Sequence, residues 1–247
     1  MSEVPFTKQM RKVTREIHAV SDAMVNAKLA FALSDNAVWA EGLLVFYEIF
    51  RYLEEAMARL KNTNVGKLDV EGMRRTDAFQ EDLNFYLGSE WTKQYEPRES
   101  VVKYLLHLQK CEKSDPNLLM AYIYHLYMGL LSGGQILAKK RSLNKKLFPF
   151  SSQQPCGNAV TDFGDIPISK IKKELVEAMN NVAIELDEET KQKILKESKT
   201  VFILNNEMIR SIEGTGKILI KKLLMIILLG VLIIGTYISL FHLEKYL

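Results

Sequence analysis

The chain has 247 residues and a formal net charge of +3, and hydrophobic and charged residues make up 47% and 26% of it. These values are typical of a globular protein, so they exclude a disordered chain and a protein that crosses a membrane many times. The basic residues are spread along the sequence, which excludes a basic nucleic-acid-binding arm and predicts no nucleic-acid partner.

Two amphipathic helices are predicted in the first 60 residues. From Phe6 to Leu29 the apolar residues recur at three- and four-residue steps, which is typical of a helix with one face on the core. Asp35 or Ser34 caps the next helix, whose apolar stripe extends to Leu53. No alternating strand pattern with Asn-Gly or Asp-Gly turns occurs in the chain, so we predict an all-α fold.

Five further helices are predicted along the rest of the domain. They span about Val70–Tyr86, Pro97–Cys111, Ser114–Leu143, Ile168–Glu185 and Asp187–Ile212. Pro97 suits the first position of its helix, where a missing amide proton costs nothing. The stretch from Phe148 to Pro167 is rich in proline and glycine and is predicted to be an irregular loop.

The run from Leu223 to Phe241 contains no charged residue and approaches the ~20 residues that span a bilayer. Lys217, Lys221 and Lys222 precede this run, and only Lys245 follows it, which places the large N-terminal part in the cytosol. No apolar signal segment is present at the start. We therefore predict a helical domain (1–213), a short basic linker (214–222), a single transmembrane anchor (223–241) and a tail (242–247).

Cys111 and Cys156 are the only cysteines. Without a CxxC pair or a disulfide framework, they indicate a reducing compartment and argue against a thiolate metal site.

Of the four histidines, His107, His125 and His242 have contexts typical of structural residues. His18 differs because Asp22 follows it by one i+4 step on the first predicted helix. Such a carboxylate can hold one ring nitrogen and leave the other free for a metal. The pair alone is a weak signal, since most lone histidines on amphipathic helices are packing or surface residues.

Gly129, Gly133 and Gly134 lie inside a predicted helix, where each glycine costs about 1 kcal/mol relative to alanine. They would let a large flat ligand approach the backbone, but they equally permit close helix packing or a kink. The letters LSGGQ, ending at Gln135, also form the signature of ABC transporter nucleotide-binding domains. No GxxxxGK[ST] loop or βαβ pattern accompanies them, which excludes that class.

An ordered set of segments resembles the heme oxygenases over about residues 5–212, and the C-terminal anchor is similar to that of animal members. The segments are Thr14–His18, Phe46–Glu55, Phe79–Leu83 with Gly88 and Trp91, Tyr127–Gln135, and Lys199–Asn205. The resemblance implies a multihelical domain in which heme b lies between the first helix and the glycine-kinked helix.

The resemblance also assigns roles to single residues. His18 falls on the family's iron ligand, and Asp22 falls on the carboxylate that holds the other nitrogen of that ligand. The backbone at the three glycines is expected to pack against the porphyrin. The remaining expected heme contacts are Arg11, Arg15 and Tyr124 near the propionates and Phe202 in the apolar wall.

The activity implied is the oxidative cleavage of heme to biliverdin, carbon monoxide and iron with dioxygen. Electrons are expected from an NADPH-dependent reductase, and biliverdin reductase is a further expected partner. The anchor implies contact with membrane lipid and a place on the cytosolic face of the endoplasmic reticulum.

Two positions depart from the family pattern. Leu130 stands where the family carries an aspartate that orders water and delivers protons, and Phe50 stands where it usually has a tyrosine. No catalytic side chain is therefore assigned with certainty. The departures keep open a non-degrading or peroxidase-like heme binder, such as a carrier or sensor, and a membrane-tethered helical scaffold without a cofactor ranks last.

Overall fold

The computed structural model describes residues 4–29, 35–147 and 157–213, together with residues 220, 224, 227–228 and 230–236. The described chain is helical and contains no strand. Its helices are α1 (Phe6–Leu29), α2 (Asn36–Arg59), α3 (Thr76–Leu87), α4 (Glu99–Ser114), α5 (Leu119–Gly129), α6 (Gln135–Leu147), α7 (Ile168–Glu185) and α8 (Glu188–Ser211). Short helical turns lie at Gly66–Leu68 (η1), Trp91–Lys93 (η2), Pro116–Leu118 (η3), Leu130–Gly134 (η4) and Ala159–Thr161 (η5).

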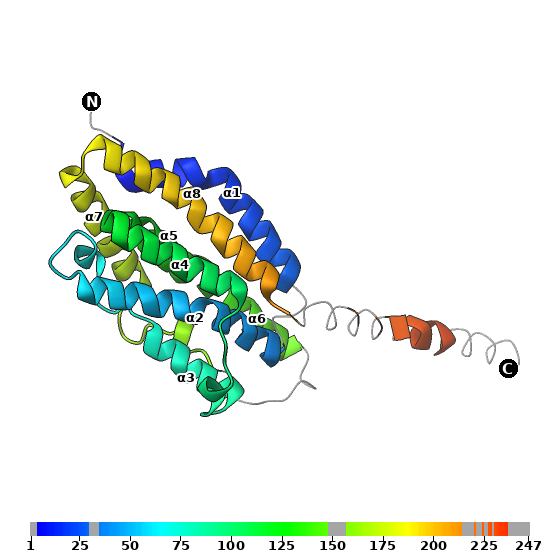
Figure 1. Cartoon of the computed structure of the whole chain (residues 1–247). Coiled ribbons are helices and arrows are strands. Elements are labelled where there is room, and N and C mark those ends of the chain that lie inside the picture. Colours follow the sequence, from blue (N-terminus) through cyan, green and yellow to red (C-terminus); the bar gives the residue numbers. More distant parts are fainter. Residues whose placement is uncertain are drawn as a thin grey trace, which may run out of the picture.

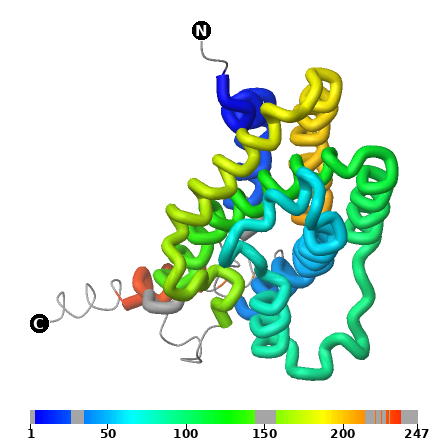
Figure 2. The backbone as a smooth tube through the Cα atoms, turned by 90° about the vertical axis from the view of Figure 1, so that its left-hand side faces the viewer, coloured from blue at the N-terminus to red at the C-terminus, as the bar shows by residue number. Residues whose placement is uncertain are grey.

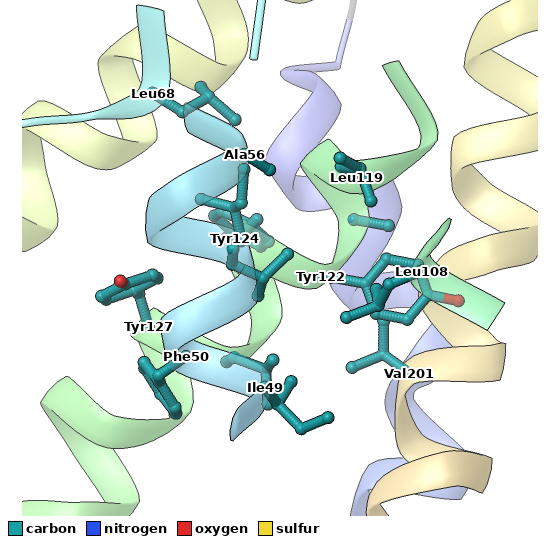
Figure 3. Close-up of a cluster of buried hydrophobic side chains, with 14 of the residues drawn as sticks. Ile49, Phe50, Ala56, Leu68, Leu108, Leu119, Tyr122, Tyr124, Tyr127 and Val201 are labelled. Atoms are coloured by element: carbon teal, nitrogen blue, oxygen red, sulfur yellow. The ribbon is translucent and has the colours of Figure 1, made fainter. Parts of the chain in front are cut away.

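The helices pack around α5, which runs through the interior of the body. α8 lies beside α1 and contacts α5, α2 packs on α3 and α4, and α7 crosses α5 (Figures 1 and 2). The side chains of α5 from Leu119 to Tyr124 are all buried. Figure 3 shows this core, in which three tyrosines of α5 lie among aliphatic side chains from the surrounding helices. The all-α prediction is confirmed over the described residues.

The predicted bounds of the first helix and of Ile168–Glu185 are confirmed by α1 and α7. Asp35 caps α2, since its side chain accepts the N–H groups of Ala37 and Val38. Asp187 caps α8 in the same way and accepts the N–H of Thr190. Local sequence signals are sufficient at these ends, because the capping group lies within a few residues of the helix.

The predicted start of α3 at Val70 is wrong, and the helix begins at Thr76. Gly72 has φ +77°, a left-handed conformation that ends any helix before it. The N–H groups at the start of α3 are then taken up by Glu54 of α2, whose carboxylate accepts from Arg75 and, at 3.2 Å, from Thr76. A tertiary contact therefore sets this boundary.

The prediction for Pro97 is also wrong, because α4 begins at Glu99 and the proline stays outside it. The long helix predicted from Ser114 is divided as well. The Asp115 side chain caps η3, in which Pro116 takes the first position, and α5 follows. At η4 the chain forms a π-helical turn over the glycine-rich segment before α6 continues.

No helix among the described residues is long and apolar enough to cross a membrane. Nine of the 19 residues of the predicted anchor (223–241) lie outside the described residues, as does His242.

Candidate functional site

One face of α1 carries Arg11, Arg15, His18 and Asp22, which follow each other at steps of four, three and four residues. All four side chains are exposed, whereas the opposite face of α1 packs on α8. Arg11 donates one hydrogen bond from Nε to the carbonyl of Thr7 at 3.4 Å. Neither arginine forms an ion pair with a carboxylate among the described residues. The face therefore presents two uncompensated cations beside an imidazole.

His18 is held by Asp22, since His18 Nδ1 lies 3.0 Å from Asp22 Oδ2. The carboxylate favours the tautomer with the proton on Nδ1, so the Nε2 lone pair is left available. Nε2 makes no hydrogen bond to a described residue. The side chain of His18 is 54% exposed, which leaves this nitrogen accessible to a ligand.

Phe202 of α8 packs between α1 and α5 at the base of this face. Its ring centroid lies 5.2 Å from that of His18 and 5.1 Å from that of His125 on α5. Sequence reasoning treated His125 as structural, yet the structure places it beside the candidate ligand. The signal was its position four residues before Gly129, which puts both on one face of α5.

His125 is a buried imidazole whose Nε2 has no hydrogen-bond partner among the described residues. Burial, together with a smaller contribution from the nearby His18, lowers the pKa of His125 to about 3. The ring is therefore neutral at physiological pH.

The glycine cluster divides into an open part and a covered part. A Cβ added at Gly129 or Gly133 would meet nothing within 4 Å, and both residues are exposed. A Cβ at Gly134 would instead lie 2.8 Å from Cδ1 of Leu130. Gly134 thus differs from the other two glycines, because the Leu130 side chain covers it, and the expected contact of all three glycines with the porphyrin stays a prediction.

α1 meets the α5–α6 segment again beyond the glycines, where Lys140 Nζ donates to Asn26 Oδ1 at 3.0 Å. Between this contact and Phe202, both segments carry exposed faces. The imidazole of His18 belongs to one face, and the bare backbone of Gly129 and Gly133 belongs to the other.

The surroundings of Phe50 are apolar. Its buried ring lies 5.0 Å from that of Tyr127, beside which Figure 3 shows it, and 5.1 Å from that of Phe79. One turn further along α2, Glu54 accepts a hydrogen bond from the Tyr127 hydroxyl at 2.8 Å while it caps α3. Its acceptor sites are thus engaged in holding the fold. Neither Phe50 nor Leu130 offers an acidic proton here.

Tyr124 is buried in the middle of α5, next to His125 in the sequence, where burial raises the pKa of its phenol and Arg11 opposes that shift. The phenol is therefore neutral and near a cation, a combination that suits a carboxylate ligand. Its expected place beside Arg11 and Arg15 at the heme propionates stays a prediction.

These residues fit a flat, metal-bearing ligand with acidic substituents. The available imidazole nitrogen supplies a metal ligand, the open glycines permit close approach of a ring, and the two arginines match anionic groups at its edge. The fold is that of an all-α protein, and the exposed faces of α1 and of the α5–η4–α6 segment carry the groups that such a ligand requires.

Comparison with known proteins identifies the family. The heme oxygenase family model matches residues 4–211, so this chain belongs to the heme oxygenase family. It is similar to heme oxygenase 1 of Bos taurus, with 28% identity over 217 residues that cover 85% of this chain and 72% of the bovine protein.

Two solved structures have the same fold. Heme oxygenase-1 from the cyanobacterium Synechocystis, in complex with heme, superimposes with a TM-score of 0.76 at 25% identity, covering 93% of this chain and 100% of that one. Heme oxygenase 2 from Chlamydomonas reinhardtii, without heme, gives 0.75 at 28% identity, covering 85% and 98%.

Proposed function

We propose that this chain binds heme between α1 and the α5–η4–α6 segment and cleaves it to biliverdin, carbon monoxide and iron. Dioxygen and electrons from an NADPH-dependent reductase complete the reaction. The observation that carries the proposal is the His18 imidazole, whose Nδ1 is held by Asp22 while Nε2 stays accessible. When bound, heme is both the substrate and the group that activates dioxygen.

The chain's own residues bind and orient this substrate. Arg11 and Arg15 pair with the propionates, and the Tyr124 phenol adds a neutral donor at the same edge. Phe202 packs against the His18 ring and limits the access of water on that side. Biliverdin reductase is the expected consumer of the product.

A second candidate function, a heme carrier or sensor or a peroxidase-like protein, is favoured by one observation. We infer that Leu130 stands at the position of the family's distal aspartate, and its side chain lies against Gly134 with no acidic group of its own. Without a proton donor there, heme binding persists while cleavage slows.

Gly133→Ala in the full chain tests heme binding. The added methyl meets open space, so folding stability should rise by about 0.5–1 kcal/mol, as expected for a helical glycine replaced by alanine. Heme affinity should fall, because the methyl occupies the space that the ring needs. Thermal unfolding without heme measures the change in stability, and titration with hemin measures the change in affinity. The heme complex is then reduced in air by a reductase, and the formation of biliverdin is measured.

Gly134→Ala is the matched variant, because its methyl is directed at Leu130 rather than at open space. It should raise folding stability less than Gly133→Ala does, because the Leu130 side chain must move aside, and it should also change hemin affinity less. Equal hemin affinity in wild type and Gly133→Ala would contradict this placement of heme.

We propose that residues 223–241 anchor the domain on the cytosolic face of the endoplasmic reticulum membrane through lipid contact. The uncharged run supports this, as do its described aliphatic side chains, which are 53–61% exposed instead of packed on the body. Exposed apolar side chains of this number favour an apolar environment over water.

The anchor predicts that the full chain remains in the membrane fraction after alkaline carbonate washing. A chain that ends at residue 213 should be released. The matched control carries Leu228→Lys and Ile233→Lys, because each lysine at the centre of a span costs about 2.5–3.5 kcal/mol. Retention of this double variant in the membrane would refute insertion of the segment.

A further inference from the structure

A cluster of metal-binding side chains lies between α4 and α8 and includes none of the residues of the proposed heme site. His107 and Cys111 occupy one face of α4 at an i, i+4 spacing, and Glu197 faces them from α8. His107 Nε2 lies 2.9 Å from Glu197 Oε2 and 3.4 Å from Cys111 Sγ. All three potential ligand atoms lie within 4.8 Å of one another.

The cluster is partly enclosed. Cys111 is 3% exposed, and the side chains of Glu197 and His107 are 16% and 29% exposed, so solvent reaches it from one side. The Tyr122 hydroxyl donates to Glu197 Oε2 at 2.5 Å from the interior. Figure 3 shows Tyr122 directed from α5 towards Leu108 of α4 and Val201 of α8.

We propose that His107, Cys111 and Glu197 bind one zinc-class divalent cation, with water as the fourth ligand. Imidazole nitrogen, thiolate sulfur and carboxylate oxygen together suit Zn²⁺ and disfavour Mg²⁺ and Ca²⁺, which prefer oxygen ligands. The Tyr122 hydroxyl donates to the same Glu197 oxygen that contacts His107, and it orients the carboxylate as outer hydrogen bonds do at zinc sites.

Two of the separations between ligand atoms are close to those of a tetrahedral site. With bonds of about 2.0–2.3 Å to zinc, neighbouring ligand atoms lie roughly 3.3–3.7 Å apart. The separation between His107 Nε2 and Cys111 Sγ falls in this range at 3.4 Å. The contact of 2.9 Å with Glu197 needs to open by about half an ångström, which side-chain rotation supplies.

A plain hydrogen-bond network accounts for the cluster less well. His107 Nε2 carries at most one proton, so donation to Glu197 leaves no lone pair there for the Cys111 thiol. A bound cation uses all three ligands at once, because the thiol becomes a coordinated thiolate and its proton passes to solvent.

The test is a calorimetric titration of the detergent-solubilised full chain, without heme, with Zn²⁺. One ion should bind per chain, and Co²⁺ should produce the absorption band of a thiolate ligand. Cys111→Ser should abolish that band and weaken Zn²⁺ binding by at least about 100-fold, whereas Tyr122→Phe should weaken it by roughly tenfold, the cost of an outer hydrogen bond.

Two controls separate this cluster from other sites. Cys156→Ser removes the other thiol, and His18→Ala removes the proposed heme ligand, and both variants should retain wild-type Zn²⁺ affinity. No binding by the wild type, or binding that survives Cys111→Ser, would overturn the proposal. Loss of binding in either control would also overturn it. Heme binding is measured separately, so failure here leaves the proposed function standing.

Discussion

His18→Ala is expected to remove the histidine signature from the absorption and electron paramagnetic resonance spectra of the bound ferric heme. Heme cleavage should fall by at least about 100-fold with it, because the axial ligand sets the electronic properties of the iron. The reason lies in the pair of His18 and Asp22, which presents a single accessible imidazole nitrogen to the site. Spectra of hemin-reconstituted variant and wild type measure the effect.

Added imidazole provides a sharp control for this variant. His18 is more than half exposed, so the space left by alanine is open to a small molecule, and free imidazole should restore the histidine signature. His125→Gln is the matched variant at the neighbouring imidazole and should keep the wild-type spectrum. If the spectrum is unchanged in His18→Ala, or if the histidine signature is lost in His125→Gln, the iron ligand is His125 instead of His18.

The second large effect is expected from Leu130→Asp, which should increase biliverdin formation by about 10²–10⁴-fold, the usual worth of a positioned general acid. Leu130 and Phe50 leave this part of the site without a proton donor, and Glu54 is engaged in capping α3 and binding Tyr127. Single turnover of heme with a reductase in air, followed by biliverdin absorbance, measures the rate.

The variant Leu130→Asn distinguishes the effect of the acidic proton in Leu130→Asp from the effect of the changed side-chain shape. Asparagine has nearly the size of aspartate but carries no acidic proton, so it should leave the rate close to that of wild type. Equal rates in Leu130→Asp and Leu130→Asn would show that the carboxyl group is not the limiting factor. A wild-type rate that already equals that of Leu130→Asp would place the proton donor elsewhere.

The features that the sequence predicts well are local. α1 and α7 follow from their apolar periodicity, and His18 with Asp22 follows from an i+4 spacing within one helix. The family resemblance then gave this pair its chemical meaning. Periodicity and capping depend on residues a few positions apart, which is why a single sequence suffices for them.

What the sequence missed depends on contacts between distant segments. Glu54 sets the start of α3 from more than 20 residues away, and Phe202 of α8 brings His125 beside His18. The sequence predicts no thiolate metal site at Cys111, because no second cysteine lies near it in the chain. Its partner Glu197 becomes visible only when α8 packs on α4.

The π-helical turn at Leu130–Gly134 changes the angular register of the side chains between α5 and α6. One extra residue in the turn advances every later side chain by about 100° around the axis, because an α-helix has 3.6 residues per turn. Arg141 of α6 is thereby directed into the body, where it stacks 4.8 Å over Trp39 and donates to Asn36 at 2.6 Å. Because of this one inserted position, the α5–η4–α6 segment exposes the backbone of Gly129 and Gly133 in its first half and directs a structural cation into the protein in its second half.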